Sequence, residues 1–395
     1  MTLNLSFCLL GVLSWWKRIV SKNLVATLVI HVGAQKCGST TIQHALANIV
    51  SVVDQDVLKF RIFPAELAER MHQECGSVSN QDIDLQFDGL LKENSCLILS
   101  NELLGNYPVV VAKLAERARE LFPTGRILII GYTRAQYSYY ASEYKQWYFR
   151  ARPMLRGDID FFRRKNLLPD KFLPFERRMF VNSIMSFREH RQPDWDMYYK
   201  ALEASFDCDH HIEIYSSHIP SSDLNYSLIE DFLQKLSLSV SELSVLPSLP
   251  DRSNSSFNPV FCESVALGLC DQSIDSSLWP GPHENNHLIE QASNLFVLHH
   301  DHDSLEQLVG ASKLFQSINA AITMNFSNSN AMYCQRFGID ERYFGDGKDE
   351  DASVSKEQLF EIVRQVQNSR DTKKIDDYKQ QLLSELKRVE YVFEQ

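Results

Sequence analysis

The chain lacks an excess of basic residues. Its 395 residues include 40 Lys and Arg against 51 Asp and Glu, which gives a net charge of −11. Proteins that bind nucleic acid through its phosphates normally carry the opposite balance, so this class is disfavoured. Glycine and proline are also few, at 15 and 13, which excludes collagen-like and low-complexity architectures. With 44% apolar residues, we expect a folded chain with a sizeable core.

Metal-site patterns and long apolar runs are missing as well. The eight cysteines include no CxxC pair and no histidine partner at zinc-site spacing, so we expect neither a zinc site nor a disulfide scaffold. The reduced cytoplasm is then the default compartment. Residues 3–16 are mostly apolar but shorter than the roughly 20 residues that span a bilayer. Lys17 and Arg18 follow this run, whereas a signal peptide has its positive charge first. A helix packed on the domain is expected, with a membrane-surface anchor as the alternative.

What is present is an alternation of short apolar runs with helical patterns. The runs at 24–32, 96–100 and 126–132 are typical of buried parallel strands. Apolar residues recur at helical spacing from Ser39 onward and again over 111–121. Strands that alternate with helices predict an α/β fold, with a central parallel sheet flanked by helices in three layers.

Composition also suggests where the chain divides. Residues 134–178 hold eleven Lys and Arg against five acids, a local balance of +6 that favours an anionic ligand or acceptor. For Arg163, Arg164 and Lys165 the alternative is an ordinary solvated helix face. A polar stretch at 346–351 predicts a linker, and two amphipathic helices should follow it. We therefore expect an N-terminal apolar extension at 1–26, a catalytic domain at 27–345 and a C-terminal part at 346–395.

A glycine-containing loop lies between the first strand and its helix. It consists of Gly33, Ala34, Gln35, Lys36, Cys37, Gly38, Ser39, Thr40 and Thr41. Unpaired backbone N–H groups and the helix dipole make such a helix start suitable for a phosphate or sulfate. A nucleoside-triphosphate P-loop, GxxxxGK[ST], would require lysine at position 39. Here that position is Ser39, and Lys36 stands two residues before the second glycine.

This displaced lysine resembles the P-loop-like 5′-phosphosulfate loop of sulfotransferases that use 3′-phosphoadenosine 5′-phosphosulfate (PAPS). A second element has the family's spacing: Arg134 ends the third strand, and Ser142 lies eight residues further on. The resemblance is to bacterial and carbohydrate-type members and covers about residues 27–345. It includes the segment 192–199 and a later strand at 212–215. The Arg-Lys-Gly run of the phenol and steroid enzymes is missing, and the 252–256 loop is the substitute candidate for further donor contacts.

The resemblance implies a role for each motif residue. Lys36 would neutralise charge on the bridging oxygen, and Arg134 with Ser142 would hold the 3′-phosphate. The 5′-phosphate would be held by the amides of Cys37, Gly38, Ser39, Thr40 and Thr41 and by the hydroxyls of Ser39 and Thr40. No metal is implied, because a sulfuryl group carries less charge than a γ-phosphate.

Glu102 is the candidate general base. It follows the second strand, at the carboxyl edge where open α/β sheets bind ligands. Glycan sulfotransferases use a glutamate there, and the phenol and steroid enzymes use a histidine. The alternative is that Glu102 caps the next helix. His31, inside a strand, is expected to be a core residue, and His44 is a minor candidate.

These features together predict an enzyme that transfers a sulfuryl group from PAPS to a hydroxyl acceptor, most simply a glycan or glycolipid. The aromatic and basic residues between Tyr139 and Arg178 favour a sugar, since aromatic rings stack on sugar faces, but the same residues could equally bind a lipid headgroup. A nucleotide kinase is the rival enzyme, and a non-catalytic nucleotide-binding protein is the rival from another class.

Overall fold

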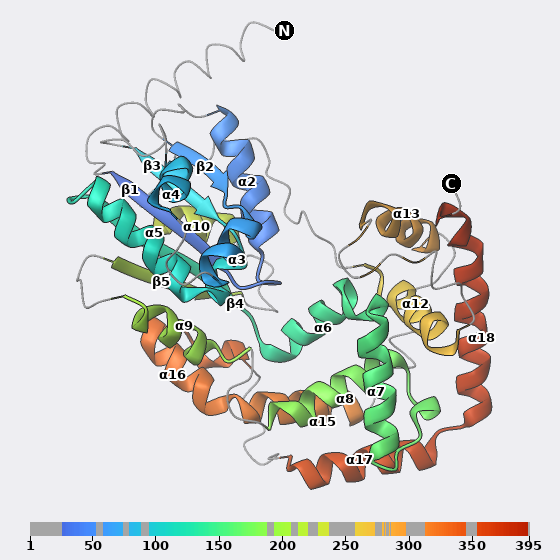
Figure 1. Cartoon of the computed structure of the whole chain (residues 1–395). Helices are drawn as coiled ribbons and strands as arrows, with labels where there is room; N and C mark the ends of the chain where they lie inside the picture. The colour runs from blue at the N-terminus through green and yellow to red at the C-terminus, as the bar shows by residue number, and fades with distance from the viewer. Residues whose placement is uncertain are drawn as a thin grey trace, which may run out of the picture. The chain divides into compact units, whose positions relative to one another are not determined.

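The computed structural model forms two compact units that interleave along the chain (Figure 1). It describes residues 26–52, 58–73, 79–87, 95–187, 193–206, 212–219, 228–236, 257–272, 279, 281, 284, 286–297, 313–344 and 354–393. The first unit is drawn from 1–134, 194–254 and 329–343, and the second from 135–193, 255–328 and 344–395. The apolar run at 3–16, the 252–256 loop and the linker at 346–351 lie outside the described residues.

The first unit contains a five-stranded parallel sheet in the order β2-β3-β1-β4-β5. The strands are β1 (Thr27–Gly33), β2 (Leu58–Ile62), β3 (Cys96–Ser100), β4 (Arg126–Thr133) and β5 (Ile212–His218). The predicted α/β class with a central parallel sheet is confirmed. The sequence had not indicated β2, which is an edge strand whose apolar residues alternate with Lys59 and Arg61.

The register of the central strands aligns their carboxyl ends. His31 of β1 lies opposite Ser100 of β3 and Ile130 of β4. Every residue of β1 and β3 is buried, which explains why both strands are apolar runs. The residues that follow β1, β3 and β4 therefore emerge side by side at one edge of the sheet.

Helices cover both faces of this sheet. On one face the ring of His31 packs against Phe232 of α10, and on the other Tyr199 of α9 lies over Gly131. The helices of this unit are α2 (Ser39–Val52), α3 (Ala65–Gln73), α4 (Asn80–Phe87), η1 (Leu104–Asn106), α5 (Pro108–Leu121), α9 (Trp195–Ala204), α10 (Leu228–Lys235), α16 (Ser327–Phe337) and η5 (Glu341–Phe344). The arrangement fits a three-layer α/β domain.

The second unit is helical throughout its described residues. It comprises α6 (Gln136–Gln146), η2 (Tyr148–Arg150), α7 (Arg152–Arg164), η3 (Pro169–Lys171), α8 (Pro174–Ser186), α12 (Pro259–Asp271), α13 (Asn286–Val297), α15 (Lys313–Asn325), α17 (Lys356–Ser369), α18 (Thr372–Val389) and η6 (Glu390–Phe393). The two predicted C-terminal amphipathic helices are α17 and α18, and they bury Leu359, Val363, Leu382 and Leu386. That prediction is confirmed.

The aromatic residues of the basic stretch belong mainly to the core of this second unit. Tyr139, Tyr140 and Tyr144 are buried, so these three rings are not exposed for stacking on a sugar, whereas Trp147 and Tyr148 are half-buried. Aromatic content alone does not distinguish a binding face from a helix-packing face. Arg178 is equally buried, in an ion pair of 2.9 Å with Asp158.

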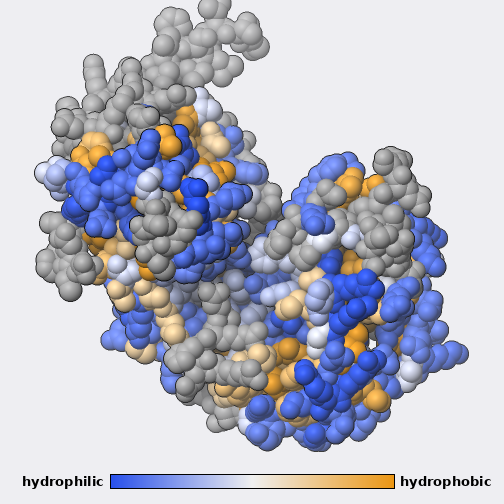
Figure 2. Space-filling model, in the orientation of Figure 1, coloured by the Kyte–Doolittle hydropathy of each residue, from blue (hydrophilic) through white to orange (hydrophobic). Residues whose placement is uncertain are grey.

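The outer surface of α7 is different. Arg156, Arg163, Arg164 and Lys165 are exposed, which agrees with a solvated face for the triplet. Figure 2 shows a mostly hydrophilic surface with scattered apolar residues on the face it draws. Within the described ranges, no helix is both long enough and apolar enough to cross a membrane.

Candidate functional site

The loop after β1 has a backbone that only certain residues adopt easily. Gly33 and Gly38 both have φ of 83°, in the left-handed region that favours glycine. A Cβ atom on Gly33 would stand 2.9 Å from the Cα of Glu102. A side chain at position 33 would therefore push the loop away from Glu102. Lys36 also has a left-handed conformation, with φ of 64°, which is unusual for a residue with a side chain.

The loop closes on itself before α2 begins. The amide of Cys37 donates to the carbonyl of Ala34 over 3.2 Å, and the hydroxyl of Ser39 points to the same carbonyl at 3.4 Å. The Cys37 side chain is fully buried. The amide of Cys37 and the hydroxyl of Ser39 thus have partners inside the loop. Thr40 and Thr41 lie half-buried in the first turn of α2, where backbone N–H groups have no intrahelical acceptor.

Glu102 lies beside Lys36. Burial raises the pKa of the Glu102 carboxyl, and the positive charge of Lys36 lowers it in part. The side chain is half-buried, so it combines desolvation with a nearby cation. That combination suits a group that accepts a proton in a reaction.

The capping alternative for Glu102 finds no support in the local hydrogen bonds. The turn after β3 is held by Asn101, whose Oδ1 accepts from the amide of Leu103 at 2.8 Å. The Asn101 Nδ2 donates to the carbonyl of Phe63 at 2.6 Å. The short helix η1 that follows has no side-chain cap. The carboxylate of Glu102 is thus not used to begin this helix.

Arg134 reaches the same loop from the end of β4. Its Nη1 donates to the carbonyl of Lys36 over 3.1 Å. Its Nε is buried and has no hydrogen-bond partner among the described residues. The Nε atoms of Arg177, Arg178 and Arg336 are in the same state, so this atom by itself does not indicate a ligand. The structure therefore brings Lys36, Glu102 and Arg134 together at one sheet edge.

The other predicted residues lie elsewhere. Ser142 is half-buried on α6 in the second unit, so its pairing with Arg134 stays a prediction. His31 is fully buried, its Nδ1 is 2.8 Å from the Ser100 hydroxyl, and burial lowers its pKa to about 3. It is the expected core histidine. His44 is exposed on α2.

Sequence reasoning overlooked His218 at the end of β5. Burial lowers the pKa of His218 to about 4, against a hydrogen bond with the backbone of Tyr343, and the charge of Arg134 lowers it further. The ring lies between the Thr133 hydroxyl at 3.2 Å and the Tyr343 carbonyl at 3.1 Å. His218 is therefore a neutral, fixed neighbour of Arg134. The sequence feature that could have indicated His218 is its position just after a predicted strand, where ligands of parallel sheets bind.

Two cations, a helix start and a carboxylate thus lie at one edge of a parallel sheet, an arrangement whose charges would suit an anionic ligand. Among the described residues, no three His, Cys, Asp or Glu side chains gather as a metal site would require. No protein-family model matches the chain. A search of the curated proteins also finds no match.

Proposed function

We propose that the protein is a sulfotransferase that moves a sulfuryl group from PAPS to a hydroxyl acceptor, most simply on a carbohydrate. The observation that carries the proposal is the convergence of Lys36, Glu102 and Arg134 on the loop after β1. These are the three charged residues that the sequence resemblance selects, and they come from separate segments of the chain.

The donor would bind with its 5′-phosphosulfate against the start of α2. The helix N-terminus and Lys36 supply positive charge there. Arg134, whose guanidinium reaches the Lys36 carbonyl, is the candidate for contact with a second anionic group, the 3′-phosphate. Ser142 of α6 is the predicted partner of Arg134 in that contact.

The transfer itself needs a proton acceptor and a cation. Glu102 would take the proton of the acceptor hydroxyl as that oxygen attacks the sulfur in line with the leaving phosphate. The bond between sulfur and the bridging oxygen breaks, and adenosine 3′,5′-bisphosphate leaves with the negative charge. Lys36 would stabilise this charge as it develops.

The acceptor is the least constrained part of the proposal. A glutamate at the base position resembles the glycan enzymes, and both histidines considered as bases lie in unsuitable surroundings, one fully buried and one exposed. The described cysteines are all free, which supports a cytoplasmic location. Residues 3–16 stay the candidate for contact with a membrane surface.

Calorimetry with adenosine 3′,5′-bisphosphate and with 5′-AMP tests the donor assignment. We expect clearly tighter binding of the bisphosphate. In the Arg134→Ala variant the preference should shrink by about 1.5–3 kcal/mol, the range for hydrogen bonds to charged groups. Equal affinity of the natural protein for both ligands would refute the assignment. Magnesium-dependent ATP binding in their place would favour the kinase alternative.

A further inference from the structure

Helix α9 contacts two segments of the candidate site, the end of β1 just before the loop and Arg134 after β4. Trp195, at its first position, has a buried ring whose Nε1 donates to the carbonyl of Arg134 over 2.9 Å. Tyr198, one turn later, donates its hydroxyl to the carbonyl of Val32 over 3.0 Å. Val32 directly precedes the loop. The guanidinium of Arg134 donates to the carbonyl of Lys36 within that loop.

The space for Tyr198 is provided by a glycine. A Cβ atom on Gly105 would lie 1.4 Å from the Tyr198 hydroxyl oxygen, so any other residue there would displace the ring. Gly105 follows β3 in η1, on the chain segment that also carries Glu102. The tyrosine therefore fits into a gap between the segments that follow β1 and β3.

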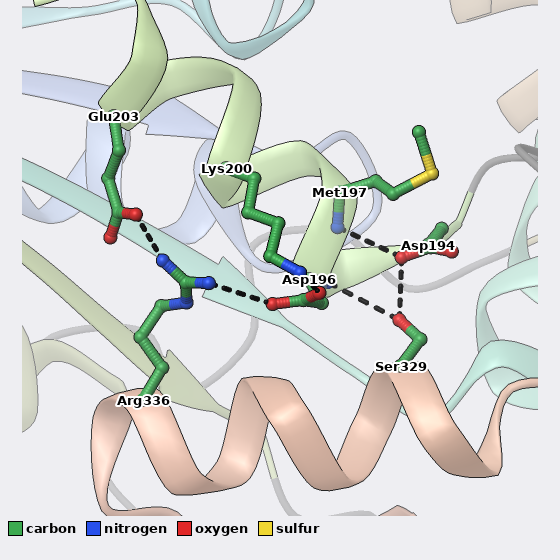
Figure 3. Close-up of polar contacts among 7 residues, drawn as sticks. All are labelled: Asp194, Asp196, Met197, Lys200, Glu203, Ser329 and Arg336. Atoms are coloured by element: carbon green, nitrogen blue, oxygen red, sulfur yellow. Dashed lines mark hydrogen bonds and ion pairs between the residues drawn. The ribbon is translucent and has the colours of Figure 1, made fainter.

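The position of α9 is itself fixed by α16, as Figure 3 shows. Asp194 accepts from the amide of Met197 at 3.0 Å and caps the helix, and the Ser329 hydroxyl donates to the same Asp194 oxygen at 2.6 Å. Further along, Arg336 of α16 bridges Asp196 and Glu203 of α9. These contacts leave α9 little freedom to rotate or slide.

We propose that Trp195 and Tyr198 are positioning residues. They hold Arg134 and the start of the loop after β1 at a fixed distance from each other in the donor site. Tyr198 fixes the start of the loop that would bind the 5′-phosphosulfate of the donor. Trp195 fixes the backbone of Arg134, whose side chain would bind the 3′-phosphate. This inference rests on the proposed function, and it assigns a separate task to each residue.

The separate tasks give a test that general loss of structure would not mimic. Trp195→Phe keeps an aromatic ring but loses the N–H group. We expect it to weaken binding of adenosine 3′,5′-bisphosphate about two- to tenfold, the value of one hydrogen bond, and to leave 5′-AMP binding unchanged. Tyr198→Phe should weaken binding of both ligands by a similar factor. Both affinities are measured by calorimetry on one preparation, so an unfolded fraction does not change their ratio.

The matched control is Tyr215→Phe. The Tyr215 hydroxyl donates to Glu213, which pairs with Leu128 of β4, and both residues lie on the edge strand β5. Neither takes part in the hydrogen bonds that link α9 to Arg134 and Val32, so both affinities should stay unchanged. A double-mutant cycle adds a second readout: in an Arg134→Ala background, Trp195→Phe should have no further effect on bisphosphate binding.

Several results would overturn the inference. Equal weakening of 5′-AMP and bisphosphate binding by Trp195→Phe would mean that the variant merely loosens the fold, and that result rejects the assignment. An undiminished effect of Trp195→Phe in the Arg134→Ala background also rejects it. If Trp195→Phe does not fold, Tyr198→Phe decides, with its melting temperature measured beside the two affinities. Equal weakening of both ligands at an unchanged melting temperature supports the inference. Selective or absent weakening, or weakening that accompanies a lower melting temperature, rejects it. A natural protein that does not prefer the bisphosphate would instead refute the proposed function.

Discussion

Lys36 combines an unfavourable backbone conformation with a charge placed beside Glu102. A left-handed φ at a residue with a side chain costs on the order of 1–3 kcal/mol and tends to occur at functional sites. Lys36→Gly removes the ammonium group while permitting the same backbone. We expect kcat to fall about 10²- to 10³-fold, with bisphosphate affinity changed much less and stability equal or higher. Steady-state kinetics and urea unfolding measure the two effects, and an unchanged kcat would show that another cation serves the leaving group.

Burial of the ionised Glu102 carboxylate lowers the free energy of unfolding, and a neutral glutamine at this position would not have that effect. Its folded pKa is raised above the ordinary 4.5, so folding favours the protonated form. The stability that this form contributes is lost as the pH rises through the raised pKa. Glu102→Gln should therefore be at least as stable as the natural protein at neutral pH, and its turnover should be about 10²- to 10⁴-fold lower.

The pH profile gives an independent check on Glu102. A base must be ionised, so the rate of the natural protein should rise with pH to a plateau, with a midpoint above 4.5. The residual rate of Glu102→Gln should lack this acid limb. A variant with near-normal rate and an unaltered profile would move the search for the base to another residue.

At the scale of elements, the sequence predicted buried strands better than exposed ones. The runs that became β1, β3 and β4 are continuous and apolar because both faces of the sheet are covered. The edge strand β2 was missed because its apolar residues alternate with Lys59 and Arg61 over only five residues, so it contains no continuous apolar run. The sequence motifs predicted the loop at 33–41 and Arg134 as site residues. The contact of Trp195 with Arg134 was not predicted, because it joins residues 61 positions apart. Such a contact follows from the packing of α9, which no local pattern contains.

The link between α9 and α16 should be worth more than a surface ion pair. Arg336 bridges Asp196, whose side chain is only 5% exposed, and Glu203. Arg336→Ala leaves Asp196 with Lys200 as its remaining ion-pair partner. We expect a loss of about 1–3 kcal/mol in the free energy of unfolding. Arg388→Ala removes an exposed pair with Glu385 and should cost about 1 kcal/mol or less. Equal losses in urea unfolding would mean that the bridge is only a surface feature.

At the scale of the whole molecule, the two units divide the sequence differently from the expected domains. The unit with the sheet takes in α16 from beyond residue 328, and the helical unit takes in the C-terminal helices. Composition could not predict this, because chain segments far apart in sequence share one core. The helical unit also explains the misinterpreted aromatic stretch: its tyrosines and several of its arginines pack inside, and the exposed charge is left on α7.

The most direct test of the account follows the sulfuryl group itself. Purified protein is incubated with PAPS labelled in the sulfuryl group and a panel of oligosaccharides, lipids and phenols, and the products are identified by mass spectrometry. We predict label on a carbohydrate hydroxyl with the natural protein, and a strongly reduced amount with Lys36→Gly and Glu102→Gln. Absence of labelled product across the panel, or equal labelling by the natural protein and both variants, would contradict the account.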